Sequence, residues 1–415
     1  AGSGLPVTEQ VALLAAVAAA LPKDEQAIAV AVSGGGDSLA LLHLAHLAGA
    51  KVHAVTVDHG LRAGAAAEVA LVARHCADWG IPHQVLVWDH GGQIAGNLMA
   101  AARTARYALM ADWARGAGIG TVWLAHTADD QAEGFLIALA RGAGLEGLSG
   151  MRDGWVSDGV RFARPLLSVS RQALREHLTA HGIAWAEDPS NSNDRFTRAR
   201  IRKALAVLAP LGLGTAQLAQ SARHLATARA ALDQTLAAWA LEHVQAVAGT
   251  LRIDRAAFAA LAAEHRRRLI LAALRWLNRA EHPPRGPDQM RFLDALAQGR
   301  GATLQGVRAR ITPQTILLVR EPRALVGVTA GPECLWDGRW QVSGPFPGGA
   351  ILRALGEAGL VQRPDWREAG IGREALLVSP AVWHGDALIA VPLLDSATGW
   401  KAETTGEFRL FILSH

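Results

Sequence analysis

The sequence has little cysteine and no apolar run long enough to cross a membrane. Its 415 residues include two cysteines, Cys76 and Cys334, and neither belongs to a CxxC pair. A disulfide scaffold, a zinc ribbon and a thioredoxin-type motif are therefore excluded. Two isolated thiols suit a reducing cytoplasm, where we expect the protein to act. No stretch supplies the about 18 uninterrupted apolar residues of a membrane helix, so we expect no membrane partner.

Lysine is also scarce, and arginine carries nearly all of the positive charge. The formal net charge is +4, and the lysines are Lys23, Lys51, Lys203 and Lys401. This modest excess permits a polyanionic partner, because arginine can grip phosphate with two parallel hydrogen bonds. Half of the residues are hydrophobic and 19% are charged, so the chain can bury a sizeable core. Global disorder is excluded on the same grounds.

The first half of the sequence alternates apolar strands with helical segments. Continuous apolar runs predict strands, and apolar residues three to four positions apart predict helices. We expect strands at 27–32, 51–57, 85–88 and 121–125, and helices at 38–47, 68–79, 98–113, 128–141 and 171–181. This succession predicts an α/β fold with a doubly wound parallel sheet. Ligands of such sheets bind at the carboxyl ends of the strands, so polar residues directly after strands are the first site candidates.

Beyond the predicted sheet, the composition changes twice. A boundary near 210–214 is followed by a stretch, 216–280, that is typical of helices throughout, and then by a Pro- and Gly-rich hinge at 282–287. From about 322 onward, glycine and proline interrupt short apolar runs. We therefore predict an α/β domain at 1–210, a mostly helical domain at 211–320 and a small β-rich or mixed domain at 321–415. A polar loop at 187–194 precedes a basic segment.

A glycine-rich segment, Ser33-Gly34-Gly35-Gly36-Asp37-Ser38, lies between a predicted buried strand and a helix. Its glycines let the backbone approach a ligand, and successive N–H groups at a helix N-terminus form an anion site. Asp37 is repulsive beside a phosphate unless a cation intervenes, and Mg²⁺ is the natural one. The segment is neither a Walker A motif nor a GxGxxG fingerprint. The structural alternative is a glycine turn with a Ser or Asp helix cap.

In this strand–loop–helix setting, the segment resembles the phosphate loop of the N-type ATP pyrophosphatases, the PP-loop superfamily, which cleave ATP to AMP and pyrophosphate. Further segments narrow the resemblance to the tRNA(Ile)-lysidine synthetase family. Together the motifs cover roughly residues 25 to 205, and the remaining half matches weakly. The further segments are Val57-Asp58-His59-Gly60-Leu61-Arg62, Asn97-Leu98 with Ala101-Ala102-Arg103 and Arg106-Tyr107, 124–133, 140–151, and Glu187-Asp188-Pro189-Ser190-Asn191 with Phe196 and Arg200-Ile201-Arg202.

The resemblance implies an ATP-dependent ligase that forms a carbon–nitrogen bond and uses ATP and Mg²⁺. Its substrates would be free L-lysine and an isoleucine tRNA with a CAU anticodon. In the family reaction, ATP adenylates O2 of the wobble cytidine, the ε-amine of lysine attacks C2, and AMP leaves to give lysidine. The oligomeric state stays open, with a dimer as one option. The expected cofactor contacts are Ser33, Gly34, Gly35, Gly36, Asp37, Ser38, Asp58 and His59.

Acidic residues gather after the fourth predicted strand, together with His126. Asp130 and Glu133 are three residues apart, so they share one face of the helix that follows. Clustered carboxylates need a cation, and the candidates are the lysine ammonium and Mg²⁺. An acidic first turn that complements the helix dipole is the alternative, and it explains Asp129 and Asp130 better than Glu133. We assign Asp130 and Glu133 to lysine, with a carboxylate as proton acceptor, and His126 to a polar role near the reacting base.

Two further positions are candidates for nucleotide contact. Asp58-His59 ends the second predicted strand, where adenine or ribose contact competes with a simple turn. Arg103 and Arg106 share a helix face, and solvent exposure is their default. We expect Arg103 to stabilise charge at the α-phosphate. The predicted catalytic groups are thus Asp37, Arg103, His126, Asp130 and Glu133, with Asp37 also the metal ligand.

Basic residues in two segments are candidates for tRNA contact. A glycine-punctuated loop at 141–150 follows a helix, and a helix C-cap is its alternative explanation. The segment at 195–203 carries one aromatic residue, Phe196, that could stack on a base, and a solvated helix face is the alternative. A further basic tract at 252–310 could follow the tRNA backbone. The predicted tRNA contacts are Arg141, Arg195, Arg198, Arg200, Arg202 and Lys203.

Three positions depart from the family pattern, and three other functions compete. Met99 stands where the family usually has Glu, Gly134 where it has Thr, and Ala199 where Asn is common. A PP-loop tRNA thiolase usually needs clustered cysteines, which this sequence lacks, and a glutamine-dependent synthetase needs an amidotransferase cysteine or an ammonia channel. A catalytically silent RNA-binding paralogue gains nothing from clustered acids beside RNA. The leading hypothesis is therefore the lysidine-forming ligase.

Overall fold

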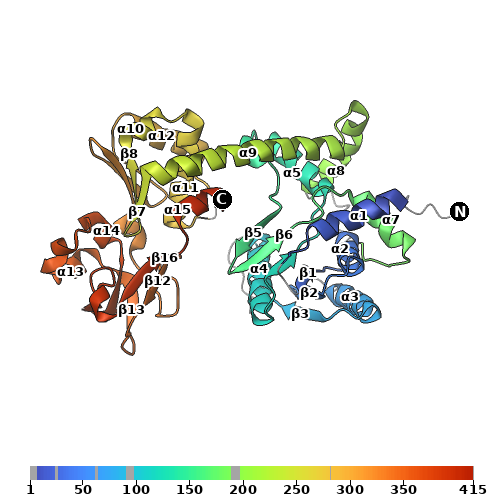
Figure 1. Ribbon diagram of the computed structural model, residues 1–415, viewed down its shortest axis with the longest axis horizontal. Coiled ribbons are helices and arrows are strands. Elements are labelled where there is room, and N and C mark those ends of the chain that lie inside the picture. Colours follow the sequence, from blue (N-terminus) through green and yellow to red (C-terminus); the bar gives the residue numbers. More distant parts are fainter. Residues whose placement is uncertain are drawn as a thin grey trace. The chain divides into compact units, whose positions relative to one another are not determined.

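The computed structural model of the chain describes residues 7–23, 27–60, 64–89, 98–187, 197–280 and 282–414. By their internal contacts, the residues form two compact units, Ala1–Arg229 and Ala230–His415. The point of division lies within the long helix α9 (Thr215–His243), which is labelled in Figure 1. The three-domain division at 210 and 320 stays a prediction. Residues 188–194 of the predicted polar loop lie outside the described residues.

The first unit is built on a six-stranded sheet with the strand order β3-β2-β1-β4-β6-β5. Neighbouring strands from β3 to β6 are parallel, and β5 runs antiparallel to β6. The predicted α/β fold with a mainly parallel sheet is therefore confirmed. The strands are β1 (Ile28–Ala31), β2 (Val52–Asp58), β3 (His83–Val87), β4 (Thr121–Trp123), β5 (Gly154–Ser157) and β6 (Val160–Ala163).

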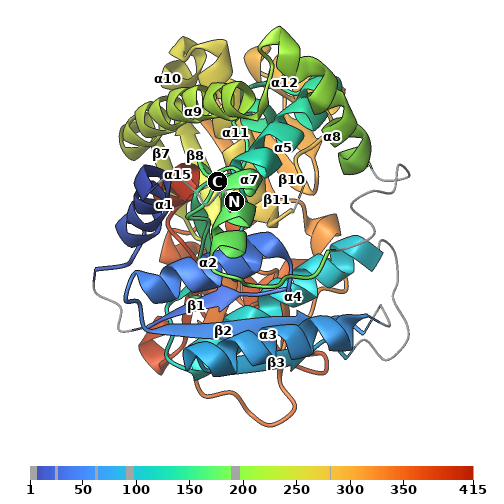
Figure 2. The same cartoon turned by 90° about the vertical axis from the view of Figure 1, so that its right-hand side faces the viewer.

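Helices cover both faces of this sheet, as the continuous apolar character of β1 predicts. Ile28 and Val30 pack in one cluster with α2, whereas Ala29 and Ala31 pack in another with α4. Figure 2 shows α2 and α3 beside β1, β2 and β3. No helix in the described part of the chain is both long and apolar enough to traverse a bilayer. The helices are α1 (Val7–Ala19), α2 (Gly36–Leu47), α3 (Ala65–Trp79), α4 (Leu98–Gly116), α5 (Ala128–Ala140), α6 (Leu145–Leu148), α7 (Arg171–Ala180) and α8 (Thr197–Leu208), followed by the short η2 (Ala209–Leu211).

The second unit begins with a five-stranded antiparallel sheet, in the order β7-β8-β11-β10-β9, packed against helices. Its strands are β7 (Val244–Val247), β8 (Thr250–Asp254), β9 (Ala302–Leu304), β10 (Val307–Ile311) and β11 (Thr315–Arg320). Its helices are α10 (Arg255–Ala260), α11 (Ala263–Asn278) and α12 (Gly286–Ala297), joined by the C-terminal α15 (Phe408–Ser414).

The prediction that 216–280 is helical throughout is wrong between residues 244 and 254. There β7 and β8 form a hairpin whose turn residues, Ala248 and Gly249, have φ of +48° and +70°. Leu251 and Ile253 are buried and the intervening Arg252 is exposed, which is the two-residue period of a strand. The turn has Ala-Gly in place of the Asn-Gly or Asp-Gly pair that marks such hairpins, so the Ala-rich pattern on both sides gives no local sign of it.

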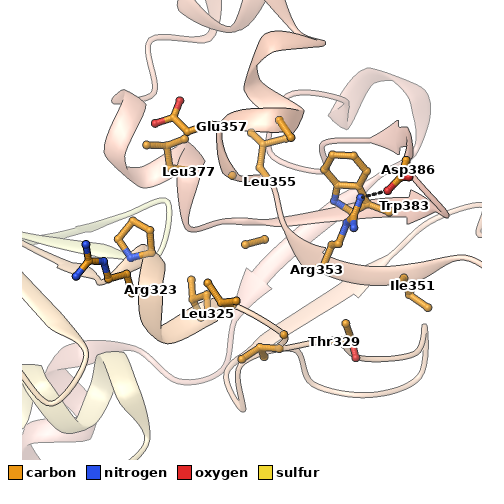
Figure 3. A pocket seen from close by; sticks show the side chains of 17 residues that line it. Arg323, Leu325, Thr329, Ile351, Arg353, Leu355, Glu357, Leu377, Trp383 and Asp386 are labelled. Atoms are coloured by element: carbon orange, nitrogen blue, oxygen red, sulfur yellow. Dashed lines mark ion pairs between the residues drawn. The ribbon is translucent and has the colours of Figure 1, made fainter.

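The β-rich character predicted for the end of the chain is confirmed. Two small sheets, β12–β16 and β13-β14-β15, surround a core of their own. A cavity of about 610 Å³ opens beside them (Figure 3), where the Arg353 guanidinium lies 4.0 Å from the centre of the Trp383 ring. No predicted site residue lines this cavity. The elements are η3 (Pro322–Leu325), β12 (Trp340–Ser343), β13 (Ile351–Ala354), α13 (Gly356–Val361), η4 (Pro364–Ala369), α14 (Arg373–Leu377), β14 (Pro380–His384), β15 (Ala387–Ala390), η5 (Ser396–Thr398) and β16 (Lys401–Thr404).

Candidate active site

The glycine loop 33–38 leads from β1 into α2, and its own serines close it. The Ser38 hydroxyl donates to the Gly35 carbonyl at 2.9 Å and accepts from the Ser33 backbone N–H at 3.2 Å. Gly34 has φ of +85°, a conformation that disfavours any side chain. Among the described residues, no side chain forms a cap hydrogen bond at the start of α2, so the Ser or Asp cap of the structural alternative is not formed there. The free N–H groups of this turn are suited to an anion.

The helix α5 begins at the carboxyl edge of β4 with a capping box. The backbone N–H and the hydroxyl of Thr127 both donate to Asp130 Oδ2, at 2.9 and 3.0 Å. The helix-cap explanation of Asp130 therefore accounts for one of its oxygens. The other oxygen, Oδ1, faces the glycine loop's neighbour Arg171. Glu133, one turn further along α5, has a side chain that is 1% exposed.

Arg171, the first residue of α7, joins the two predicted parts of the site. Its Nε donates to Asp37 Oδ2 at 3.1 Å, its Nη2 to Asp130 Oδ1 at 3.2 Å and its Nη1 to Glu133 Oε1 at 3.3 Å. Its backbone N–H donates to Asp129 Oδ2 at 2.7 Å. We call Arg171, Asp37, Asp130 and Glu133 the Arg171 cluster. One guanidinium thus brings the phosphate loop and the acidic helix within direct contact.

The helix α8 delivers further arginines to the same acids. Arg202 Nε donates to Glu133 Oε1 at 2.6 Å, and Arg198 Nη1 lies 4.0 Å from Asp130 Oδ1. The second oxygen of Glu133, Oε2, is buried and has no hydrogen-bond partner among the residues that the structure describes. A buried carboxylate oxygen left in this way is costly, so it is suited to a ligand that donates hydrogen bonds.

Burial and mutual attraction shape the charges of the Arg171 cluster. Burial raises the pKa of Asp37 above its ordinary value, and the Arg171 guanidinium opposes this rise without cancelling it. Burial alone would lower the pKa of Arg171, but Asp37, Asp130 and Glu133 together raise it above its ordinary value. Arg171 therefore stays charged at every accessible pH. Asp37 is the member whose ionisation the fold disfavours.

His126 follows β4 and is held as a neutral imidazole. Burial and the neighbouring Arg164 guanidinium lower the pKa of His126 to about 4. Arg164 Nε donates to His126 Nδ1 at 3.2 Å, so Nδ1 accepts and Nε2 carries the proton. Charge from Arg103 and Arg106 on α4 contributes to the lowered pKa. His126 is thus a hydrogen-bond donor within an arginine-rich wall.

Comparisons with known proteins agree with this geometry. The PP-loop domain family matches residues 7–208. The tRNA(Ile)-lysidine synthase of Ruegeria pomeroyi is 45% identical over 94% of this chain and 94% of that protein. The enzyme of the same name from Brucella suis is 36% identical over 94% of this chain and 91% of that protein. The chain belongs to the tRNA(Ile)-lysidine synthase family. Among solved structures, the U34-tRNA thiolase NcsA from Methanococcus maripaludis is similar with a TM-score of 0.46 and 14% identity, over 53% of this chain and 80% of that chain.

Membership in the lysidine synthase family confirms the resemblance that the motifs indicated. It also decides against a thiolase or an amidotransferase-type synthetase as the family of the chain. Cys76 is buried in the first unit and Cys334 is exposed in the second, and they form no disulfide. Arg171 contacts the acids of the site, but the sequence analysis does not identify it as a site residue. It is an isolated arginine at a helix start, and no motif singles it out.

Other predicted residues lie apart from the Arg171 cluster. The Asp58 side chain accepts from the Gly60 backbone N–H at 2.9 Å, which is the turn that the structural alternative predicted. His59 packs edge-on to Trp88. Arg103 is exposed and lies over the Tyr107 ring, and Arg141 is exposed at the end of α5. Arg200 and Lys203 are exposed on α8, and Arg195 lies outside the described residues.

The loop after α5 is fixed to that helix. Gln131 exchanges two hydrogen bonds with the backbone of Met151, at 2.7 and 3.0 Å. Gly150 has φ of +67°, and a Cβ there would collide with the Gln131 side chain. Of the three departures from the lysidine synthase pattern, Gly134 has open space around it and Ala199 is buried on α8. The side chain of Met99 lies outside the described part of the chain.

Proposed function

We propose that this chain converts the wobble cytidine of an isoleucine tRNA with a CAU anticodon to lysidine, using ATP and free L-lysine. Membership in the lysidine synthase family supports the reaction. The observation that carries the assignment of the site is the Arg171 cluster. In this cluster the Arg171 guanidinium contacts both the buried Glu133 and Asp37 of the phosphate loop. An ammonium substrate and a nucleotide can therefore meet there.

The reaction has two bond exchanges. Cytidine O2 attacks the α-phosphorus of ATP, and pyrophosphate leaves. The ε-ammonium of lysine then loses a proton, its nitrogen attacks C2, and the C2–O2 bond breaks as AMP departs with the oxygen. The chain must hold phosphate, neutralise the ammonium, accept its proton and bring C2 close to nitrogen.

The phosphates belong at the glycine loop, where α2 offers uncapped N–H groups beside the Ser33 and Ser38 hydroxyls. Asp37 would hold Mg²⁺. Its Oδ2 accepts from Arg171, and its Oδ1 has no hydrogen-bond partner in the described part of the chain. A carboxylate oxygen is the ligand type that Mg²⁺ prefers, so the residues fit the ion. Mg²⁺ bound there would reduce the repulsion between the Asp37 carboxylate and the phosphates.

Lysine belongs at Glu133 and Asp130. The buried Oε2 of Glu133 can accept from an ammonium, and Oε1 is already neutralised by Arg171 and Arg202. Before the substrate binds, the positive charge of Arg171 reduces the repulsion among the three carboxylates. When the ammonium binds, the guanidinium can turn to the phosphates without leaving a carboxylate uncompensated. One of these carboxylates accepts the proton that lysine gives up.

We assign His126 and the arginines around it, Arg103, Arg106 and Arg164, to contacts with the cytosine base and the α-phosphate. A neutral His126 donates through Nε2, which suits O2 of cytidine and not proton abstraction. Arg103 is exposed and can approach the phosphate, whereas Arg106 is partly buried and Arg164 is buried. Burial lowers the pKa of Arg106 and Arg164, which marks them as strongly desolvated cations. Such groups stabilise charge that develops as AMP forms.

The exposed basic residues belong to the tRNA. Arg141, Arg198, Arg200 and Lys203 are exposed at the end of α5 and on α8. These two helices also carry Asp130, Glu133 and Arg202. Phosphate contacts there would hold the anticodon loop over the cluster without specifying its sequence. Arg202 differs, because it is paired with Glu133.

The test is incorporation of labelled lysine into tRNA by the purified chain with ATP and Mg²⁺. The substrate is an unmodified isoleucine tRNA transcript with a CAU anticodon, and the control carries uridine at the wobble position. We expect label that depends on ATP and on the cytidine. Release of AMP and pyrophosphate without label would overturn lysine as the nucleophile. Absence of both would leave a silent RNA-binding paralogue.

A further inference from the structure

Three histidines come together between α2 and α7, toward the C-terminal ends of both helices. One ring nitrogen of each of His43, His177 and His181 lies within 4.8 Å of those of the other two. The ring centres are 4.4, 4.9 and 5.1 Å apart. His43 and His177 are buried, and His181 is exposed. None of them has a role in the proposed reaction.

The spacing of the rings matches that of imidazoles around one metal ion. Three imidazole nitrogens at about 2.0–2.1 Å from a tetrahedral ion lie about 3.3 Å from one another. The same geometry sets the ring centres about 5 Å apart, because each centre lies about 3 Å from the ion. His43 Nδ1 and His177 Nε2 are 2.9 Å apart, so they need to separate by a few tenths of an ångström. The widest separation among the three nitrogens, 4.8 Å, needs to shorten by about 1.5 Å for one ion to bind all of them. His177 and His181 are one helical turn apart and share a face.

The hydrogen bond that His181 makes also suits a metal ion. His181 Nδ1 donates to the His177 carbonyl at 2.8 Å, because a carbonyl oxygen only accepts. The lone pair of His181 is therefore on Nε2, and a backbone carbonyl behind a ligating imidazole is the usual arrangement at metal sites.

A hydrogen-bonded pair of buried histidines is the competing explanation. It accounts for the contact between His43 and His177, but it needs no third ring and gives no reason for His181 to lie beside them. The rings of Trp79 and His43 lie 4.8 Å apart, and the surrounding cluster is apolar. An apolar shell with an exposed His181 leaves one side of the cluster open to water, as a fourth ligand requires.

We propose that His43, His177 and His181 form a binding site for a divalent transition-metal ion, with Zn²⁺ as the favoured occupant because three imidazoles suit it. His43 is six residues after Asp37, and His177 is six residues after Arg171. The two helices therefore run side by side in the same direction, and the site lies about 9 Å from the Arg171 cluster. The ion clips α2 to α7 and sets the spacing between Asp37 and Arg171.

The test measures Zn²⁺ bound to the full-length, tag-free chain after treatment with a chelator. The chain is titrated with Zn²⁺ in the presence of a competing indicator, and Co²⁺ serves as a coloured substitute. We compare the unchanged chain with His181→Ala, with His43→Gln and with His224→Ala, whose histidine is exposed on α9. We expect one tightly bound ion per chain, and visible Co²⁺ absorption of the intensity typical of four-coordinate sites.

His181→Ala should weaken Zn²⁺ binding by at least about 100-fold and abolish the Co²⁺ band, whereas His224→Ala should change neither. His181 is exposed, so this variant tests the site even where His43→Gln unfolds the chain. Zn²⁺ should also raise the midpoint of thermal unfolding in the unchanged chain and not in His181→Ala. Failure of the unchanged chain to retain Zn²⁺, or equal affinity in His181→Ala, would overturn the proposal.

Discussion

Two groups of arginines and carboxylates in this chain are built in opposite ways. In the Arg171 cluster of the first unit, one guanidinium serves Asp37, Asp130 and Glu133 with a single hydrogen bond to each, at 3.1 to 3.3 Å. In the second unit, one carboxylate, Asp337, serves two guanidiniums. The first group has an excess of acid, and the second has an excess of base.

The second group, the Asp337 cluster, consists of Asp337, Arg320 and Arg339. Arg320 makes two parallel bonds to Asp337, at 2.9 and 2.7 Å, and donates a third to the Gly306 carbonyl at 3.0 Å. Arg339 adds a bond to Asp337 at 3.3 Å and one to the Gly249 carbonyl at 2.9 Å. The side chains of Asp337 and Arg339 are 6% and 1% exposed. Burial lowers the pKa of Arg339 to about 10.

The contrast separates a structural clamp from a receptive site. Two parallel bonds fix a guanidinium in one orientation, as in the Asp337 cluster, which ties β11 to the turn at 337–338. Single bonds to carboxylates from two helices can be exchanged one at a time. The Arg171 cluster also keeps the buried Glu133 Oε2 without a partner among the described residues. The Asp337 cluster has a buried atom of this kind too, Arg339 Nη2, but that atom is a hydrogen-bond donor, whereas Glu133 Oε2 can accept from an ammonium.

The largest expected effect comes from removing the Asp37 carboxylate from the Arg171 cluster. Asp37→Asn should lower the rate of pyrophosphate release by about 10²–10³-fold, because the phosphates lose the carboxylate proposed to hold Mg²⁺. The measurement is ATP turnover with saturating tRNA and lysine. A rate within threefold of the unchanged chain would contradict the role of Asp37.

The stability of the same variant follows from the pKa of Asp37. Burial raises that pKa above 3.8, so the folded chain disfavours the ionised form and Asp37 weakens folding at neutral pH. Asp37→Asn should therefore leave the unfolding free energy unchanged or slightly higher at pH 7. This difference should shrink as the pH falls through the raised pKa of the folded state, and it should vanish below 3.8, where Asp37 is neutral in the folded and in the unfolded chain. Denaturant unfolding at several pH values measures it.

The next largest effect breaks the clamp. Asp337→Asn should lower the unfolding free energy by about 3–5 kcal/mol, because the cations of Arg320 and Arg339 remain buried without their counter-charge. Denaturant unfolding, followed by tryptophan fluorescence, measures the loss. The matched control is Asp386→Asn, since Asp386 is fully exposed and 3.8 Å from Arg353. An equal response of the two variants would show that the clamp contributes nothing particular.

A smaller effect sharpens the account of the receptive site. Glu133→Gln should raise the KM for lysine by about 10- to 100-fold and leave the KM for ATP nearly unchanged, because a charged acceptor for the ammonium is lost. Steady-state kinetics with each substrate varied in turn measures the two constants. Equal changes in both KM values would move the lysine site away from Glu133.

The smallest effect separates two arginines of α8. Arg200→Ala should weaken tRNA binding and reduce the slope of log affinity against log salt by about one, because an exposed phosphate contact is lost. Arg202→Ala should instead change the KM for lysine, since Arg202 is paired with Glu133. Binding titrations over a range of salt concentrations test the first expectation. An unaltered slope in Arg200→Ala would place the tRNA elsewhere.

The sequence predicted those parts of the molecule that local patterns determine. The buried run of β1 and the glycine loop after it are contiguous signals, and so the parallel sheet and the place of Asp37, Asp130 and Glu133 could be expected. The carbon–nitrogen ligase family followed from motifs in their order. Arg171 could not be predicted, because its three partners lie 38 to 134 residues away in the sequence.

Strand pairing limited the prediction of the rest. The strands β5 and β6 were not foreseen, although their turn, Asp158-Gly159, has the residue pair that favours a tight hairpin. The strands β7 and β8 were hidden inside an Ala-rich stretch. The assignment of Arg202 to the tRNA alone also overlooked its bond to Glu133, which depends on how α8 packs on α5. Pairings of this kind are fixed by distant segments and leave little local trace.

The order of the Arg171 cluster along the chain has a consequence for synthesis. All three acids precede residue 171, and the arginines that neutralise them, Arg171 and Arg202, are added later. A nascent chain that has just completed α5 therefore carries the acids without their guanidiniums. The ribosome delivers the neutralising charge only as it makes α7 and α8. The acids of the site thus acquire their paired guanidiniums only when α7 and α8 have been made.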